Sequence, residues 1–136
     1  MTSLPMISHV SVGAKDVAKA GAFYDAVLTP LGYKRIMSSP TANSWGEKFP
    51  TFWAQTPFDE KAPSPGNGVH ICFSAPSAAA VDAFFAAGLK QGGVDDGPPG
   101  IRREYTPNYY AAFLKDLDGN KIEALCFLSE SALKAL

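Results

Sequence analysis

The 136-residue chain has little of what marks a secreted or membrane protein. Its two cysteines, Cys72 and Cys126, are too few for a disulfide framework, so we expect two reduced thiols. It has no uninterrupted apolar stretch of membrane-spanning length, and its N-terminus lacks the basic start and apolar run of a secretory signal. These absences predict a cytoplasmic protein that does not contact a membrane.

An excess of charge of one sign is also missing. Twelve Lys and Arg residues oppose 13 Asp and Glu residues, which gives a formal net charge of -1, and these residues are scattered along the chain. Proteins that bind nucleic acid carry a concentrated basic face, and none is visible here. The composition therefore predicts a small-molecule substrate and no nucleic-acid partner.

What the chain does contain is an internal repeat. Residues 9–32 align without a gap on residues 70–93, and each copy begins with one of the only two histidines, His9 and His70. A fixed period of this kind indicates two copies of one supersecondary unit. The aligned identical pairs include Ala22 with Ala83, Phe23 with Phe84, Leu28 with Leu89 and Gly32 with Gly93.

The first copy has the pattern of one strand, one helix and three further strands. Residues 6–13 alternate as a strand does, and Asp16 then precedes an apolar stripe of helical spacing that ends at Gly32. Further strands are predicted over residues 33–39, 42–48 and 51–55. Residues 57–68, dense in Pro, Gly and charge, are predicted to be a linker.

The second copy repeats this plan. A strand begins at His70, Ser77 caps a helix, and strands over 109–115 and 121–127 flank the hairpin signal Asp118-Gly119. Residues 94–108 are rich in Gly, Pro and polar side chains, so we expect a long loop with at most a short strand over 101–105. The chain is predicted to be a single α+β domain of two βαβββ modules, 6–56 and 69–128.

Strand alternation places three metal-ligating side chains on the helix-free side of these modules. His9, His70 and Glu123 each alternate with residues that face a predicted helix. Two imidazoles and one carboxylate leave coordination positions open on a divalent metal, which can be Fe, Mn, Ni, Co or Zn. The ordinary alternative is structural histidines and a solvated glutamate, but both histidines occupy the same position of a repeat.

Other residues are candidates for a substrate pocket on the same side. Trp53, Tyr109 and Phe113 are either ordinary core aromatics or the walls of a cavity, and Cys72 is otherwise a small apolar core residue. In the long loop, Arg102 or Arg103 is placed to hold an anionic group. We predict catalytic roles for Glu123, Tyr109 and Glu104, and substrate contacts for Ser11, Trp53, Gln55, Cys72, Arg102, Tyr105 and Phe113.

The chain resembles the vicinal oxygen chelate superfamily in the phrases FYDAVLTPLGYKR, GVHICFSA and YYAAFLKDLDGNKIEAL. This superfamily includes glyoxalase I, the fosfomycin-resistance enzymes, extradiol dioxygenases and bleomycin-binding proteins, and the resemblance is strongest to small glyoxalase-like members. It implies a curved mixed sheet around a cavity, helices on the outer face, and a divalent metal with ligand positions at His9, His70 and Glu123. The modules of such proteins pair within one chain or across a dimer, and we expect a homodimer.

The chain departs from several branches of that superfamily. Resemblance to glyoxalase I would place a second glutamate on the strand that here reads TFWAQ, so the proton carrier of that isomerase is missing. The fosfomycin-resistance enzymes have a tyrosine where this chain has Phe113. Extradiol dioxygenases share the ligand set but are usually longer.

Two functions follow from the sequence. The first is a metal-dependent enzyme that chelates a small oxygen-bearing substrate, with lyase, isomerase or extradiol-type dioxygenase chemistry. The second is a metal-free binding protein, like the bleomycin-binding proteins, that sequesters an aromatic or drug-like ligand against Trp53, Tyr109 and Phe113.

Overall fold

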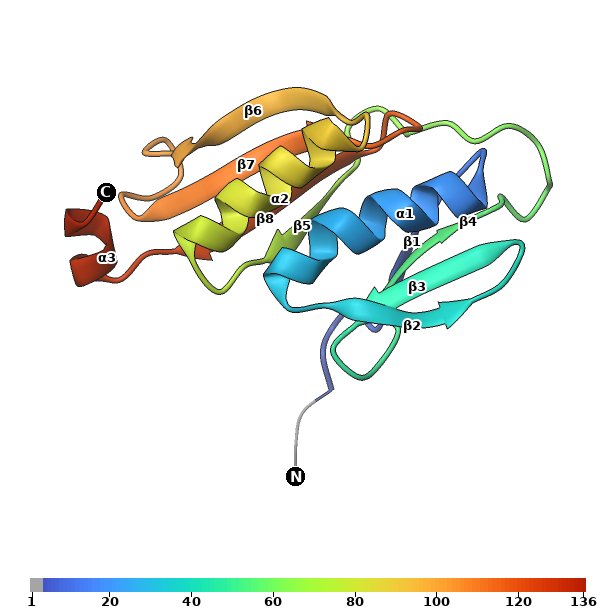
Figure 1. Cartoon of the computed structure of the whole chain (residues 1–136), viewed down its shortest axis with the longest axis horizontal. Coiled ribbons are helices and arrows are strands. Elements are labelled where there is room, and N and C mark those ends of the chain that lie inside the picture. The colour runs from blue at the N-terminus through green and yellow to red at the C-terminus, as the bar shows by residue number, and fades with distance from the viewer. Residues whose placement is uncertain (1–3) are drawn as a thin grey trace.

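The computed structural model describes residues 4–136, and its elements follow the order of the repeat (Figure 1). The first module contains β1 (Val10–Gly13), α1 (Val17–Leu28), the short 3-10 helix η1 (Thr29–Leu31), β2 (Lys34–Ser38), β3 (Ala42–Gly46) and β4 (Phe52–Gln55). The second contains β5 (His70–Ser74), α2 (Ala78–Lys90), β6 (Val94–Ile101), β7 (Tyr109–Lys115) and β8 (Lys121–Phe127). A short helix, α3 (Glu130–Lys134), follows.

Each module forms its own four-stranded mixed sheet. The strand orders are β1-β4-β3-β2 and β5-β8-β7-β6, and the first strand of each module lies parallel to its last. All other neighbours are antiparallel. The predicted α+β class and the repeated β-α-β-β-β unit are confirmed, with the strands divided between two sheets.

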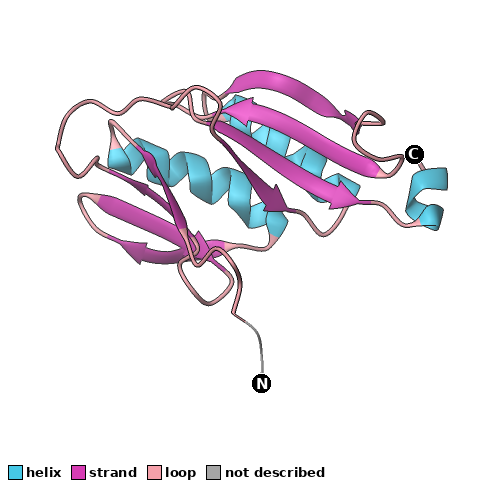
Figure 2. Ribbon diagram, turned by 180° about the vertical axis from the view of Figure 1, so that it is seen from behind, coloured by secondary structure: helices cyan, strands magenta, loops and turns pink. Residues whose placement is uncertain are grey.

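Both long helices cover the same side of the molecule. Figure 1 shows α1 and α2 side by side in front of the sheets, and Figure 2 shows the opposite sheet faces without a helix on them. The predicted caps are present, since Asp16 accepts a hydrogen bond from the Lys19 backbone N–H and Ser77 accepts one from Ala80. Fully buried side chains between the helices and the sheets include Phe23, Val27, Val81, Phe84, Leu114 and Ile122.

The β7–β8 hairpin turn, residues 116–120, also joins the two modules. The Tyr24 hydroxyl on α1 donates to Asp116 at 2.5 Å, and the Asn120 side-chain amide donates to the Gly13 carbonyl at 3.1 Å. Asp116 and Asn120 are both only 5% exposed, so water competes little for these hydrogen bonds. The turn therefore fixes the end of β1 relative to β8.

Residues 94–101 form a strand, so the long loop predicted there is wrong in its first half. Strand β6 lies at the sheet edge and pairs only with β7, with register shifts on both sides of Gly97. An edge strand tolerates proline, and bulges accommodate glycine, because part of the ladder is not hydrogen-bonded. The short strand expected over 101–105 is also wrong, because β6 ends at Ile101 and residues 103–105 form a turn.

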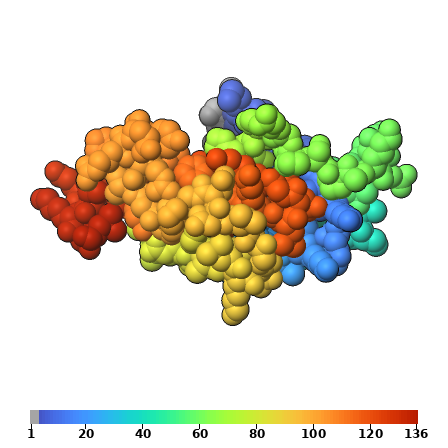
Figure 3. Space-filling view, turned by 90° about the horizontal axis from the view of Figure 1, so that it is seen from above, coloured from blue at the N-terminus to red at the C-terminus, as the bar shows by residue number. Residues whose placement is uncertain are grey.

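The remaining segments lie at the periphery. Figure 3 shows the linker, in green, projecting at one end of the molecule and α3, in red, projecting at the other. The first strand begins at Val10, later than predicted, and His9 lies immediately before it. None of the helices in the described part of the chain combines the length and the hydrophobicity needed to span a bilayer.

Candidate functional site

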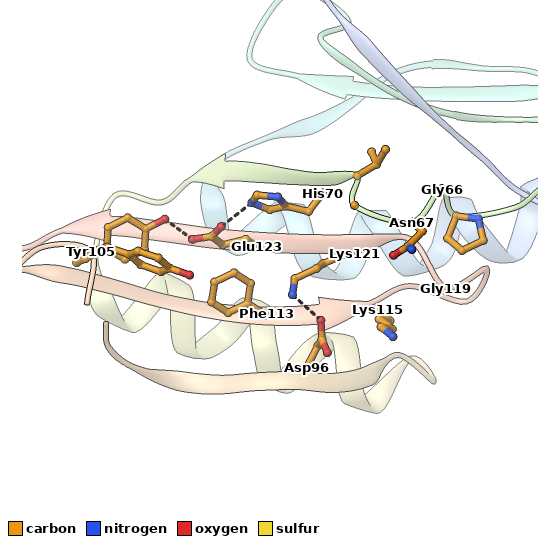
Figure 4. Close-up of a pocket in the computed structure, with 14 residues that line it drawn as sticks. Gly66, Asn67, His70, Asp96, Tyr105, Phe113, Lys115, Gly119, Lys121 and Glu123 are labelled. Carbon is orange, nitrogen blue, oxygen red and sulfur yellow. Dashed lines mark hydrogen bonds and ion pairs between the residues drawn. The ribbon is translucent and has the colours of Figure 1, made fainter. Parts of the chain in front are cut away.

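The central polar contact of the candidate site joins His70 and Glu123 on the helix-free face of the second sheet (Figure 4). The two residues come from the parallel neighbours β5 and β8, with Cys72 directly opposite Glu123. The His70 Nε2 atom lies 3.1 Å from Glu123 Oε1. The Glu123 side chain is 2% exposed, whereas that of His70 is 46% exposed. A buried carboxylate thus meets an imidazole that remains open to solvent.

Tyr109 on β7 satisfies the second oxygen of Glu123. Its hydroxyl donates to Glu123 Oε2 at 2.5 Å, and its ring packs against Tyr105 with the centroids 4.9 Å apart. Burial, together with donation to the Glu123 carboxylate, raises the pKa of Tyr109 well above its ordinary value of 10.0. The phenol is therefore a neutral hydrogen-bond donor at physiological pH, and Glu123 has a partner on each oxygen.

These residues line an open pocket of about 730 Å³, which is within the range of small-molecule sites. Its walls combine an aromatic surface with polar groups from β5, β7 and β8 and from the end of the linker. The lining residues are Pro65, Gly66, Asn67, Gly68, Val69, His70, Asp96, Tyr105, Tyr109, Phe113, Lys115, Gly119, Lys121 and Glu123.

Cys72 lies beside this cluster and lines a second pocket of about 360 Å³ between the modules. Burial, followed by the nearby charge of Glu123, raises the pKa of Cys72 to about 12. The thiol is therefore protonated at physiological pH and is a poor nucleophile. Cys126 is also a free cysteine, as the sequence predicts.

His9 does not join His70 and Glu123 within this chain. Its side chain is exposed, and its Nδ1 atom lies 3.4 Å from the neighbouring Ser8 hydroxyl. Across residues 4–136, no three His, Cys, Asp or Glu side chains converge as a metal site. The donor types of His70 and Glu123 suit a divalent metal, but the single chain brings together two of the three predicted ligands.

The other predicted residues of the first module also lie apart from the His70–Glu123 pair. Ser11 and Gln55 line a shallow pocket beneath the linker. The Trp53 indole N–H donates to the Pro50 carbonyl at 3.2 Å. These side chains lie on the first sheet, whereas the large pocket is lined by the second module and the end of the linker.

Two predicted loop residues after β6 take different positions. The Arg102 guanidinium donates to the backbone carbonyls of Pro98 and Gly100 and lies 5.4 Å from the centroid of the Phe113 ring. Glu104 is exposed in the turn that follows. Arg102 therefore braces the end of β6 against the aromatic surface of the pocket.

Comparison with known proteins places the chain in a family. Residues 6–124 match the family model of the Glyoxalase/Bleomycin resistance protein/Dioxygenase superfamily. The chain belongs to this superfamily. Divalent metals are common in the superfamily. No curated protein matches the chain.

Solved structures of this superfamily share the fold. A glyoxalase/bleomycin resistance protein from Albidiferax ferrireducens T118 is 38% identical, with a TM-score of 0.83 over 89% of this chain and 98% of that one. A superfamily enzyme from Burkholderia phytofirmans PsJN is 19% identical, with a TM-score of 0.68 over 90% of this chain and 98% of that one. A glyoxalase-related enzyme from Fulvimarina pelagi is 15% identical, with a TM-score of 0.68 over 90% and 88% of the two chains.

Charged pocket residues that sequence reasoning missed include Lys121 and Asp96. Lys121 precedes Glu123 by two positions on β8, so strand alternation alone could have placed it on the pocket face. Asp96 lies on β6, and it was missed because that segment was predicted to be a loop.

Proposed function

We propose that the chain is a metal-dependent enzyme of this superfamily, acting on a small oxygen-bearing substrate in the pocket of the second module. The observation that carries the proposal is the buried Glu123 carboxylate, 3.1 Å from the His70 imidazole at the wall of a 730 Å³ pocket. Burying a carboxylate is unfavourable unless it is paired or holds a metal, so such groups concentrate at functional sites.

The third ligand of the proposed site is His9 of the partner subunit in a homodimer. His9 is exposed at the start of β1, and the sheet face that carries the His70–Glu123 pair has no helix on it. In a two-fold dimer, each first module can cover the second module of its partner, because such an interface uses the same surfaces twice. Two identical sites would then form, each with two imidazoles and one carboxylate.

The side chains around the pair have distinct proposed roles. When bound, a divalent metal supplies a Lewis acid that chelates neighbouring substrate oxygens and stabilises the charge developing on them. Tyr109 donates to Glu123 and holds the carboxylate in one orientation, as outer hydrogen-bond partners of metal ligands do. Tyr105 and Phe113 supply apolar surface for the substrate. Lyase, isomerase and extradiol-type dioxygenase reactions are all compatible with this arrangement.

Titration of the metal-free protein with Co²⁺ tests the proposal. We expect binding of about one Co²⁺ per chain, and His70→Ala should weaken it by more than about 100-fold because a ligand is lost rather than an outer partner. Glu130→Gln removes a carboxylate on α3, away from the pocket, and should leave the affinity unchanged. A folded parent protein that binds no Co²⁺, Ni²⁺, Mn²⁺, Fe²⁺ or Zn²⁺ would refute the proposal.

One observation favours a second function, a metal-free binding protein. Both oxygens of Glu123 already have hydrogen-bond partners within the chain, His70 and Tyr109, so the carboxylate is satisfied without a metal. The aromatic surface of Tyr105, Tyr109 and Phe113 would then hold a flat ligand by stacking. This function predicts that an aromatic ligand binds the metal-free protein and that Co²⁺ does not compete with it.

A further inference from the structure

We propose that the substrate is a small carboxylic acid and that Lys121 is the residue that selects for its negative charge. This inference rests on the proposed function only for the position of the opposite, oxygen-bearing end of the substrate. The charge selection itself concerns the end of the pocket beyond Phe113 (Figure 4).

Lys121 and Glu123 lie on the same face of β8. They are two positions apart, which places their backbones about 7 Å apart along the strand. Both line the large pocket, and the Lys121 Nζ atom lies 5.1 Å from the centroid of the Phe113 ring. A ligand that reaches from Glu123 to Lys121 therefore passes over an aromatic surface.

The charges at this end of the pocket favour an anion. Lys115 and Lys121 are direct partners across the β7–β8 pairing, an arrangement that is unfavourable for two like charges. Asp96 lies 3.1 Å from Lys121, and among the described residues Lys115 has no ion-pair partner. Two lysines thus lie near one carboxylate at this end of the pocket. The second carboxylate of the lining, Glu123, is engaged by His70 and Tyr109, so a ligand carboxylate has Lys121 as its partner.

The ion pair with Asp96 also leaves Lys121 able to donate. The Asp96 Oδ2 atom is buried and receives no hydrogen bond within the described part of the chain, although the Lys121 ammonium is 3.1 Å away. The contact therefore has favourable distance but not hydrogen-bond geometry. The Lys121 side chain is 42% exposed, so its N–H groups are accessible to an acceptor in the pocket.

These positions define the ligand chemically. The ligand needs oxygens at the His70–Glu123 end, an apolar centre over Phe113, and a carboxylate about 7 Å from those oxygens. An acid built on one substituted ring has roughly this span. Such a ligand makes a charge-assisted hydrogen bond to Lys121, of the type that is about twice as strong as a neutral one.

A matched pair of probes isolates the charge. 3,4-Dihydroxybenzoate and 3,4-dihydroxybenzamide have the same ring and the same neighbouring oxygens, but only the first is an anion. We expect calorimetry to show that the parent binds the acid at least about tenfold more tightly than the amide. Lys121→Met should reduce this preference to about one, chiefly by weakening binding of the acid.

Asp96→Asn gives the opposite change. Removing the competing carboxylate should increase the preference for the acid by about threefold, since a partly exposed ion pair contributes modestly. A purely structural role of the Lys121–Asp96 pair would move both variants in the same direction. Lys61→Met, in the exposed linker, is the control and should leave the preference unchanged.

The measurements are made with and without Co²⁺, so this inference and the proposed function can fail separately. A preference for the acid that depends on Lys121 in the metal-free protein supports the inference even if no metal binds. Equal affinity for acid and amide in the parent would overturn it, as would a preference that survives in Lys121→Met. If Lys121→Met does not fold, the unchanged or reduced preference of Asp96→Asn would overturn it instead.

Discussion

At the scale of single residues, the chemistry of the site depends on how the Glu123 carboxyl group is held and oriented inside the sheet. The carboxylate is 2% exposed, and each of its oxygens has one hydrogen-bond partner, His70 or Tyr109. Removing one partner from a buried charged group leaves that group with part of its desolvation penalty uncompensated. The two partners should therefore affect stability and metal binding together.

Tyr109→Phe tests this dependence. We expect the free energy of unfolding to fall by about 1–3 kcal/mol and the Co²⁺ affinity to fall by about tenfold, because the variant removes one hydrogen bond to Glu123. Tyr105→Phe removes a hydroxyl from the adjacent ring, which contacts Tyr109 but does not bond to Glu123, and serves as the control. Urea unfolding and Co²⁺ titration measure the two effects. Equal behaviour of the two variants would contradict this role for Tyr109.

Tyr24 gives a pH-dependent prediction. Complete burial, followed by the charge of Asp116, raises the pKa of Tyr24 well above 10.0. Above pH 10 the unfolded state loses this proton while the folded state keeps it, so the free energy of unfolding is unaffected by Tyr24 below pH 10 and falls above it. In Tyr24→Phe the decline should be shallower by up to about 1.4 kcal/mol per pH unit. Urea unfolding at pH 8, 10 and 11 tests this, and parallel declines would refute it.

At the scale of elements, local patterns predicted most of the fold. Strand alternation predicted that His70 and Glu123 share the helix-free face. The two helix caps, Asp16 and Ser77, were also evident from the sequence. Strand β6 was missed because its Gly and Pro residues are tolerated only through pairing at the sheet edge, which is tertiary information. For the same reason, the contact of Asn120 with Gly13 across modules was not predictable from the hairpin signal.

Strand β3 ends at a glycine, Gly46, that cannot be replaced without moving the turn to β4. A Cβ atom at Gly46 would lie within van der Waals radius of the Phe49 backbone carbonyl, so Gly46→Ala must move the turn. We expect a loss of about 3 kcal/mol in the free energy of unfolding. At Gly100 the nearest atom to an added Cβ is the flexible end of Arg102, at 3.2 Å, and Gly100→Ala should cost less than about 1 kcal/mol. Similar losses in urea unfolding would contradict this account.

At the scale of the whole molecule, the arrangement of the two modules decides which of the predicted ligands meet within one chain, and in residues 4–136 no three of them converge. The sequence repeat predicted two equivalent histidines, and the structure separates them because each sheet keeps its own helix-free face. Whether modules pair within a chain or between chains depends on packing between them, which no local pattern encodes. The proposed metal site needs His9 from a second subunit, so static light scattering should give the mass of a dimer for the parent protein. A monomer at micromolar concentration would contradict the shared site.

The most direct test of the shared metal site combines two variants, each of which lacks one of the proposed metal ligands. His9→Ala and Glu123→Gln chains, carrying different affinity tags, are unfolded together, refolded and purified as mixed dimers, and Co²⁺ bound per dimer is measured. If His9 completes the partner's site, one of the two sites in each mixed dimer has all its ligands. We predict one Co²⁺ per mixed dimer and none in either variant alone. No Co²⁺ in the mixed dimer, when the parent binds it, would contradict a site shared between subunits.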